Sequence, residues 1–187
     1  VDIEKEQLTF LNNGKQFINV SEKDGFNHIY LYDLSGKQVA QITKGAWEVS
    51  DIYGIDQKNG LIYYQSSESS PLQRDVYVIG LNGKGKRKIS TQTGTNTASF
   101  STTFNYYILA HSSAKSPSYV SLHTNKGAVI RVLEDNAKAK AKFAEYQWSA
   151  TEFFSLTTSE GVNLNGYMIK PANFDPNKKY PNENIYP

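Results

Sequence analysis

The fold follows from a segment that recurs along the chain, first as His28-Ile29-Tyr30-Leu31-Tyr32-Asp33-Leu34-Ser35-Gly36-Lys37-Gln38-Val39-Ala40-Gln41-Ile42-Thr43. It contains an alternating apolar run, a turn at Ser35-Gly36 and a second run that ends on a hydroxyl. A copy begins 47 residues later, at residues 75–90, and a more degraded copy runs from residue 118 to 127 and on to Leu133. Each copy predicts two strands joined by a tight turn.

A second sequence motif repeats with nearly the same period as the first. Residues 13–22 begin with Asn-Gly, which favours the positive φ of a tight hairpin, and continue as a strand to Ser21-Glu22. The pattern returns at residues 59–68, and a third version follows at 104–113. Further strand candidates lie at 47–55 and 97–101.

The period therefore contains four strands in about 45 residues, which is typical of β-propeller blades. A β-sandwich also has short strands and turns, but its strands do not repeat one sequence motif at a fixed spacing. The prediction is a mostly β protein with three four-stranded blades, at about 1–45, 46–91 and 92–135, the first cut at its start.

The pattern changes after residue 135. Residues 136–147 are rich in helix formers and predict a short helical connector capped by Asn136. Its narrow apolar stripe, Ala139, Phe143 and Tyr146, predicts packing rather than a partner groove. Residues 148–181 read as a β-hairpin and a proline-rich connector, and 182–187 as a tail of uncertain origin.

Composition excludes several classes of function. The 187 residues carry 20 Lys+Arg and 18 Asp+Glu, spread along the chain except at 84–88, so no nucleic-acid partner is expected. The absence of Cys excludes disulfides and thiolate metal sites. No apolar run approaches the roughly 20 residues of a membrane helix, and residues 1–5 are too polar for a signal peptide, which would have to lie upstream.

Residues that could carry chemistry give weak signals. No Gly-x-Ser-x-Gly nucleophile elbow occurs. His28, His111 and His123 lie in or beside predicted strands and are interpreted as structural. His111 and His123 could begin a metal site, but no third ligand has suitable spacing, so neither a metal nor a cofactor is expected.

Three other motifs have ordinary explanations. Residues 83–88 superficially suggest a phosphate loop but lack its text and join two strands, so a solvated hairpin is favoured. Asn19-Val20-Ser21 matches the glycosylation pattern inside a predicted strand and is interpreted as chance. Trp47, at a crossing between blades, is expected to be buried between sheets rather than to line a binding surface.

Four segments stand out when they are read in order. They are Asp24-Gly25-Phe26-Asn27-His28-Ile29-Tyr30, Ile42-Thr43-Lys44-Gly45-Ala46-Trp47-Glu48-Val49, Arg131-Val132-Leu133-Glu134-Asp135-Asn136 and residues 164–181. Over about residues 8–181 their order and spacing resemble the dipeptidyl peptidase IV family. The last segment is similar to the family's passage from propeller into hydrolase domain.

The resemblance implies a parent serine exopeptidase of the prolyl oligopeptidase group, in which an eight-bladed propeller caps an α/β-hydrolase domain. Such enzymes remove X-Pro or X-Ala dipeptides from free N-termini. The family's catalytic residues follow the hydrolase entry, and its paired glutamates precede residue 1, so no catalytic or substrate-binding residue is expected here. Glu134-Asp135 matches the blade-to-helix junction instead, and Tyr186 is not equated with the oxyanion Tyr.

These points lead to one main expectation. The chain is a non-catalytic propeller part that helps to wall the substrate cavity, with the hydrolase domain, the remaining blades and the parent's peptide substrates as partners. Self-association through uncovered sheet faces, with Tyr and Phe at the contact, is also expected. Because animal members carry propeller disulfides, the lack of Cys suggests a bacterial homologue, periplasmic or outer-membrane associated. The alternative is a non-enzymatic propeller that binds protein or peptide on its loops.

Overall fold

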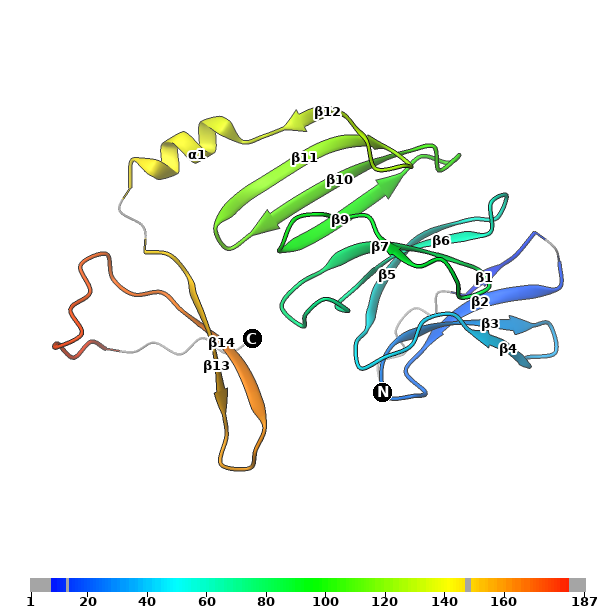
Figure 1. Cartoon of the computed structure of the whole chain (residues 1–187), viewed down its shortest axis with the longest axis horizontal. Coiled ribbons are helices and arrows are strands. Elements are labelled where there is room, and N and C mark those ends of the chain that lie inside the picture. Colours follow the sequence, from blue (N-terminus) through cyan, green and yellow to red (C-terminus); the bar gives the residue numbers. More distant parts are fainter. Residues whose placement is uncertain (1–7, 13, 147–148, 182–187) are drawn as a thin grey trace. The chain divides into compact units, whose positions relative to one another are not determined.

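The structure is a computed structural model that describes residues 8–12, 14–146 and 149–181. The chain divides into two compact units, Val1–Asn136 and Ala137–Pro187 (Figure 1). The predicted tail at 182–187 and the end of the predicted connector, residue 147, lie outside the described residues. Within the described part, no helix is long and apolar enough to cross a membrane.

The first unit consists of three four-stranded antiparallel sheets that follow one another along the chain (Figure 1). The first sheet contains β1 (Thr9–Phe10), β2 (Gln16–Ser21), β3 (His28–Asp33) and β4 (Gln38–Gln41). The second contains β5 (Val49–Asp56), β6 (Leu61–Ser66), β7 (Asp75–Gly80) and β8 (Arg87–Lys88). The third contains β9 (Thr95–Phe100), β10 (Tyr106–Ser113), β11 (Ser116–Thr124) and β12 (Val129–Glu134).

Spatial order equals chain order in each sheet. Every sheet is therefore an up-and-down meander, the arrangement of a propeller blade. The predicted class, mostly β with three four-stranded blades followed by a short helix and a hairpin, is confirmed.

Strand pairing gives the length of the repeat more accurately than the sequence motifs do. Phe10 pairs with Phe17, and 90 residues later Phe100 pairs with Tyr107. In the second sheet Ile55 pairs with Ile62, midway between them. The first two strands of each sheet thus repeat every 45 residues. The segment at residues 28–43 recurs after 47 residues because the loop between β6 and β7 is longer than the loop between β2 and β3.

Apolar residues from facing sheets form two cores. The first, between sheets one and two, contains Leu11, Ile18, Ile29, Leu31, Ile42, Val49, Ile62, Tyr64, Tyr77 and Ile79. The second, between sheets two and three, contains Tyr63, Val76, Val78, Ile89, Tyr107 and Leu109. Because side chains alternate along a strand, β6 and β7, the two central strands of the second sheet, each contribute residues to both cores.

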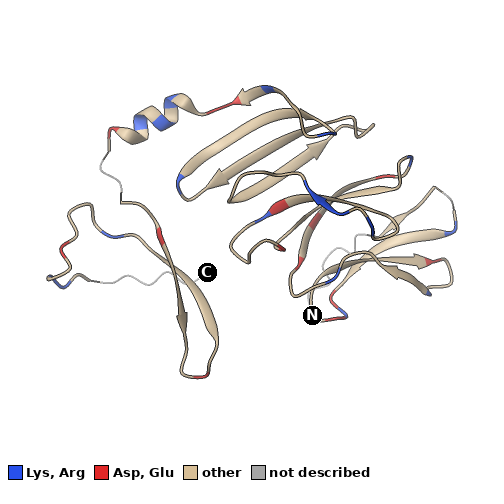
Figure 2. Ribbon diagram, in the orientation of Figure 1, with Lys and Arg blue, Asp and Glu red and all other residues tan. Residues whose placement is uncertain are grey.

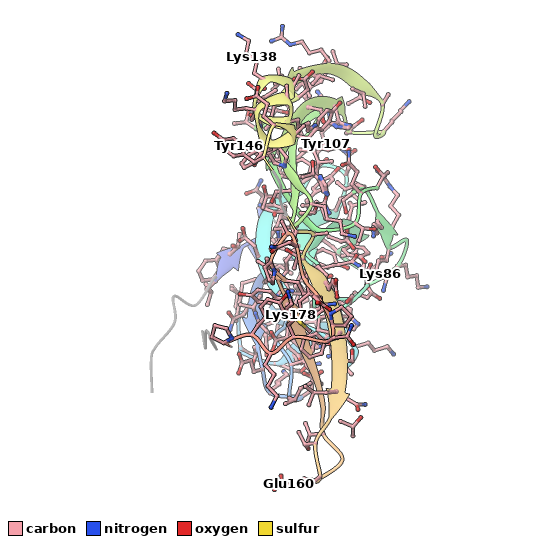
Figure 3. The ribbon with its side chains drawn as sticks, turned by 90° about the vertical axis from the view of Figure 1, so that its left-hand side faces the viewer. Lys86, Tyr107, Lys138, Tyr146, Glu160 and Lys178 are labelled. Carbon is pink, nitrogen blue, oxygen red and sulfur yellow. The ribbon has the colours of Figure 1, made fainter. Side chains whose placement is uncertain are left out.

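The second unit contains the helix α1 (Ala137–Ala144) and a hairpin of β13 (Glu152–Thr157) and β14 (Asn163–Met168). Glu160 lies at the tip of the hairpin (Figure 3). The predicted packing of the helical stripe stays a prediction: α1 has no buried residue, and Phe143 and Tyr146 are exposed. A regular apolar spacing does not reveal which surface would cover it.

Asn136 precedes α1 as predicted, but it does not adopt the extended backbone usual for an N-cap. Its φ is 52°, in the left-handed region. Its side-chain amide donates to the carbonyl of Ser118 on β11. Asn136 therefore ties the end of the third sheet to its neighbouring strand.

Candidate functional site

His28 is fully buried at the crossing from the first sheet to the second. Its Nε2 lies 3.0 Å from the carbonyl of Gly45, which can only accept, so Nε2 carries the proton. Its Nδ1 lies 3.1 Å from the hydroxyl of Thr43, which in turn accepts from the amide of Ile29. The ring packs edge-on against Trp47 at 4.8 Å. Both nitrogens thus hold the crossing together, which is a structural role.

The equivalent position in the second sheet is held by a carboxylate, Asp75, which is also fully buried. One oxygen accepts from the Ser90 hydroxyl at 2.7 Å and from the Asn96 amide at 3.2 Å. The other forms an ion pair with Lys88 at 2.7 Å. The same backbone geometry is therefore held by an imidazole ring at one crossing and by an ion pair with further hydrogen bonds at the next.

The structure brings together a serine and a histidine that sequence reasoning did not pair. Ser121 Oγ lies 2.8 Å from His123 Nε2, and His123 Nδ1 lies 3.3 Å from the carbonyl of Gly127. That carbonyl requires Nδ1 to carry the proton, so Nε2 accepts from the serine. The spacing Ser-x-His on a strand was the available signal, because residues i and i+2 share a face.

This pair resembles the first two members of a serine-hydrolase triad but lacks their setting. Both residues are buried, and the ring of Tyr107 stacks on His123 at 4.9 Å. A carbonyl rather than a carboxylate orients the imidazole, so it gives less stabilisation to an imidazolium. The geometry supports a hydrogen-bonded core pair rather than a nucleophile.

The side chain of His111 makes one hydrogen bond in the described structure, through Nε2 to the carbonyl of Thr93 at 3.0 Å. Its Nδ1 is buried and has no protein partner in the described residues. His111 and His123 do not form a metal-binding group, since no three His, Asp or Glu side chains gather anywhere in the described part. The interpretation of His111 as structural stays a prediction.

The predicted solvated hairpin at residues 83–88 joins β7 to β8. Lys86 forms an ion pair with Glu68 and places its ammonium 5.5 Å above the Trp47 ring. Charged residues elsewhere are scattered over sheets and loops (Figure 2). Trp47 packs against the core between the first two sheets, but it is only partly buried, whereas the sequence predicted a buried side chain.

Two further motifs lie where the sequence suggested. Asn19 is inside β2 and uses its side-chain oxygen to accept from the Val20 amide at 2.9 Å. Glu134 ends β12 and accepts from the Asn136 amide at 2.6 Å. Both side chains take part in local structure, and the chance reading of the glycosylation pattern stays a prediction.

Buried and partly buried tyrosines pack between the sheets. Burial raises the pKa of Tyr64, with the nearby Glu68 carboxylate adding to the effect. Burial also raises the pKa of Tyr53 to about 12, and that of Tyr107 in the same direction. These phenols stay neutral at physiological pH and act as packing groups.

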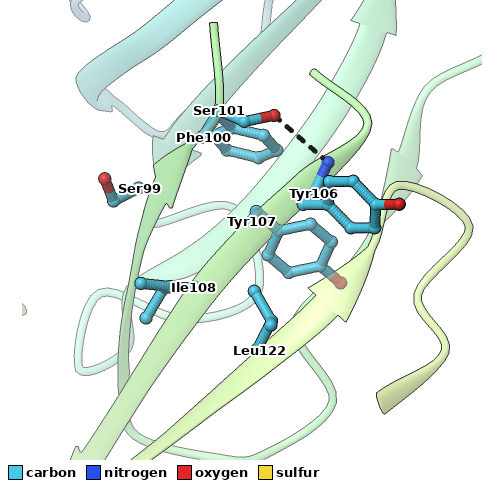
Figure 4. Close-up of a pocket in the computed structure, with 7 residues that line it drawn as sticks. All are labelled: Ser99, Phe100, Ser101, Tyr106, Tyr107, Ile108 and Leu122. Atoms are coloured by element: carbon cyan, nitrogen blue, oxygen red, sulfur yellow. Dashed lines mark hydrogen bonds between the residues drawn. The ribbon is translucent and has the colours of Figure 1, made fainter. Parts of the chain in front are cut away.

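The described structure has a shallow apolar hollow on the third sheet, with a volume of about 240 Å³ (Figure 4). Ile108 and Leu122, two of its lining residues, pair with each other on the face opposite to Tyr107, which belongs to the core with the second sheet. The lining residues are Ser99, Phe100, Ser101, Tyr106, Tyr107, Ile108 and Leu122. Small-molecule sites usually occupy about 300–1,000 Å³. A single side chain fits this hollow better than a substrate does.

Three consecutive four-stranded meander sheets define the class of protein as a β-propeller, of which these sheets are blades. The family model described as "Dipeptidyl peptidase IV (DPP IV) N-terminal region" matches residues 1–118. The chain belongs to this family.

Relatives and solved structures agree with that assignment. Dipeptidyl peptidase 4 of Trichophyton rubrum is 33% identical over 174 residues, and that of Arthroderma otae is 32% identical over 174 residues. Each match covers 90% of this chain and 22% of the relative. The crystal structure of Porphyromonas gingivalis dipeptidyl peptidase 4 matches with a TM-score of 0.86 and 43% identity, over 93% of this chain and 24% of that one. The chain therefore spans less than a quarter of the relatives described here.

Proposed function

We propose that these residues form the last blades of a propeller that caps a serine dipeptidyl peptidase and walls its substrate cavity. The blades would restrict entry to short, unstructured peptides. The parent would release X-Pro or X-Ala dipeptides from free N-termini. The hydrolase domain, the other blades and peptide substrates are its proposed partners.

The observation that carries this proposal is the likeness to Porphyromonas gingivalis dipeptidyl peptidase 4, which extends over 93% of the chain at 43% identity. The likeness includes the blades and most of the second unit, in one order. An unrelated propeller would be expected to match the blade repeats alone.

We propose further that the chain supplies no catalytic group. Ser121 and His123, the pair that comes nearest to a nucleophile and base, are buried in a strand and serve packing. The 187-residue chain should therefore give no turnover of a Gly-Pro chromogenic substrate above buffer. Release of the dipeptide, lost in Ser121→Ala, would contradict the proposal.

The wall function needs a test in the longer protein. The coding region should contain a Gly-x-Ser-x-Gly elbow followed by Asp and His within roughly 250 residues, a span set by ordinary domain size. A stop codon soon after residue 187 would favour the non-enzymatic binding propeller instead.

In the full-length enzyme, Phe104→Gly should loosen the contact between the second and third sheets. Turnover of the chromogenic dipeptide should stay unchanged, while release from a folded protein with an X-Pro N-terminus should rise.

A bacterial parent in the periplasm or at the outer membrane is the proposed setting. The absence of Cys and the likeness to a bacterial enzyme support it. Cell fractionation with an antibody to this chain would test it, and recovery in the cytoplasmic fraction would contradict it.

A further inference from the structure

The chain contains four Asn-Gly pairs, and three of them lie wholly within the described residues: Asn59-Gly60, Asn82-Gly83 and Asn165-Gly166. Asn13, of the fourth pair, lies outside them. An Asn that precedes Gly is chemically labile, because Gly has no Cβ to hinder its backbone nitrogen from attacking the Asn side-chain carbonyl carbon. The surroundings of each pair decide how readily that attack takes place in the folded protein.

Asn82 is exposed, in the turn between β7 and β8. Its Oδ1 accepts a hydrogen bond from the backbone amide of Lys84 at 3.0 Å, which folds the side chain over the backbone that follows it. The same hydrogen bond polarises the side-chain carbonyl toward attack. Its Nδ2, the group that would leave, makes no hydrogen bond within the described part of the chain.

The β7–β8 turn belongs to a sheet that has a neighbour on each face. The second sheet packs on the first through one core and on the third through the other, and Asn82 is still exposed. Residues 84–88 include four Lys or Arg (Figure 2). Two of the four form ion pairs with carboxylates in the described structure. The remaining positive charge favours the deprotonated amide of Gly83, which is the attacking species.

Asn59 is also exposed, but its side chain is held in the other direction along the chain. Its Nδ2 donates to Asp56 Oδ2 at 2.6 Å, and its backbone amide donates to Asp56 Oδ1 at 3.1 Å. The carboxylate thus holds the amide that would leave and turns it back from Gly60. Its negative charge also disfavours deprotonation of the Gly60 amide. Reaction at Asn59 therefore requires a charge-assisted hydrogen bond to break.

Asn165 is protected by the hairpin. It lies in β14, where its Oδ1 accepts from the hydroxyl of its cross-strand partner Ser155 at 3.0 Å. Gly166 pairs with Phe154, and a Cβ on Gly166 would lie 2.6 Å from Phe154 Cζ. Because a strand side chain stands out from the sheet, the Asn165 amide is held away from the next backbone nitrogen. The strand pairing and the covering ring shield this pair.

We propose that Asn82 is a deamidation site, the fastest of the three described pairs. The deprotonated nitrogen of Gly83 forms a bond to Asn82 Cγ, the bond from Cγ to Nδ2 breaks, and Nδ2 leaves as ammonia. Water then opens the resulting succinimide at either carbonyl, which gives aspartate or isoaspartate. One water is consumed, one ammonia is released, and no electron is transferred. The Gly83 amide must first leave the carbonyl of Gly80, 2.8 Å away, so the folded turn reacts more slowly than an unfolded chain.

The product alters a turn that two backbone hydrogen bonds close. Besides the bond from Gly83 to Gly80, the Gly80 amide donates to the carbonyl of Lys84 at 2.9 Å. Isoaspartate adds a methylene to the main chain between these residues, and both products add a negative charge beside the basic run 84–88. Deamidation therefore disturbs the pairing of β7 with β8.

The test is a time course of the 187-residue chain at mildly alkaline pH, folded and, in parallel, unfolded in urea. Peptide mapping by mass spectrometry follows the change from amide to acid at each pair, and an isoaspartate methyltransferase identifies isoaspartate. In urea the three pairs should react at similar rates. In the folded chain Asn82 should react at least about tenfold faster than Asn59, the effect of one hydrogen bond to a charged group. Asn165 should be slower than Asn82 by a similar factor.

Two variants provide the controls. Asn82→Ser should abolish conversion in its own peptide and leave the rates at Asn59 and Asn165 unchanged. Asp56→Asn keeps an oxygen acceptor but removes the negative charge, so the rate at Asn59 should rise toward that at Asn82.

Conversion of Asn59 or Asn165 in the folded wild-type chain as fast as that of Asn82 would overturn the proposal. An Asn82 that stays intact in the folded chain while the unfolded chain reacts would also overturn it. An unchanged rate at Asn59 in folded Asp56→Asn would contradict the protection by the carboxylate on which the order of the sites rests.

Discussion

The ring of Phe104 stacks on that of Tyr63, with centroids 5.3 Å apart and planes 6° from parallel, while the Phe104 backbone is left-handed at φ 54°. The corresponding turn of the first sheet has Gly14 at this place, with φ 61°. Both residues donate a backbone hydrogen bond to the carbonyl three residues earlier. The left-handed backbone of Phe104 costs about 1–2 kcal/mol for a non-glycine residue. The same residue places its ring on Tyr63 of the second sheet.

This relationship predicts an unusual order of stability at residue 104. Phe104→Ala keeps the strain and removes the ring, so we expect a loss of about 2–3 kcal/mol. Phe104→Gly removes the ring and the strain, offset in part by the entropy of Gly in the unfolded chain, and should be about 0.5–1 kcal/mol more stable than Phe104→Ala. Urea unfolding of both variants measures the difference. Ala more stable than Gly would show that the turn is not strained.

Gly54 should depend on the same ring. A Cβ at Gly54 would lie 2.8 Å from Phe104 Cζ, and the backbone φ of 155° is itself unfavourable for a side chain. Gly54→Ala should therefore cost about 2 kcal/mol or more in the wild type and about 1 kcal/mol less in Phe104→Gly, as contacting residues couple by about 0.5–3 kcal/mol. Equal costs in the two backgrounds would show that the ring is not what excludes the methyl group.

The sequence predicts the blades because their alternation, turns and period depend on local chemistry that each copy repeats. It does not predict the ring of Phe104 on Tyr63, since the text at residue 104 only partly matches Asn-Gly and the contact joins two blades. The Ser121–His123 pair could have been predicted from strand alternation, but its orienting carbonyl at Gly127 depends on the turn. The apolar stripe on α1 shows a related limit, because periodicity identifies an apolar face but not the surface that covers it.

The ion pair between Asp75 and Lys88 predicts that substitution of one partner costs more stability than substitution of the other. Asp75 is fully buried, whereas the Lys88 side chain is 35% exposed. Asp75→Asn keeps an oxygen for Ser90 and lets the ammonium turn to water, so we expect a loss of about 1 kcal/mol. Lys88→Met leaves a buried carboxylate without its counter-charge and should cost about 3 kcal/mol. Thermal and urea unfolding test the order, and an equal or smaller cost for Lys88→Met would contradict it.

Asp33 should make the first blade sensitive to acid. The Ser35 hydroxyl donates to Asp33 Oδ1 at 2.6 Å, and the amides of Ser35 and Lys37 donate at 2.9 and 3.1 Å. The Ser35 hydrogen bond is the main cause that lowers the Asp33 pKa below 3.8, with the two amides helping against desolvation. Because the folded pKa is depressed, the ionised carboxylate stabilises the fold above the unfolded pKa, and this contribution is lost as pH falls through the folded value. Asp33→Asn should therefore be less stable than wild type at pH 7 and approach it near pH 2, as urea unfolding at both pH values would measure. Glu22→Gln, in the exposed β2–β3 loop, is the matched control, and a gap between wild type and Asp33→Asn that is the same at both pH values would show that the charge of Asp33 contributes nothing.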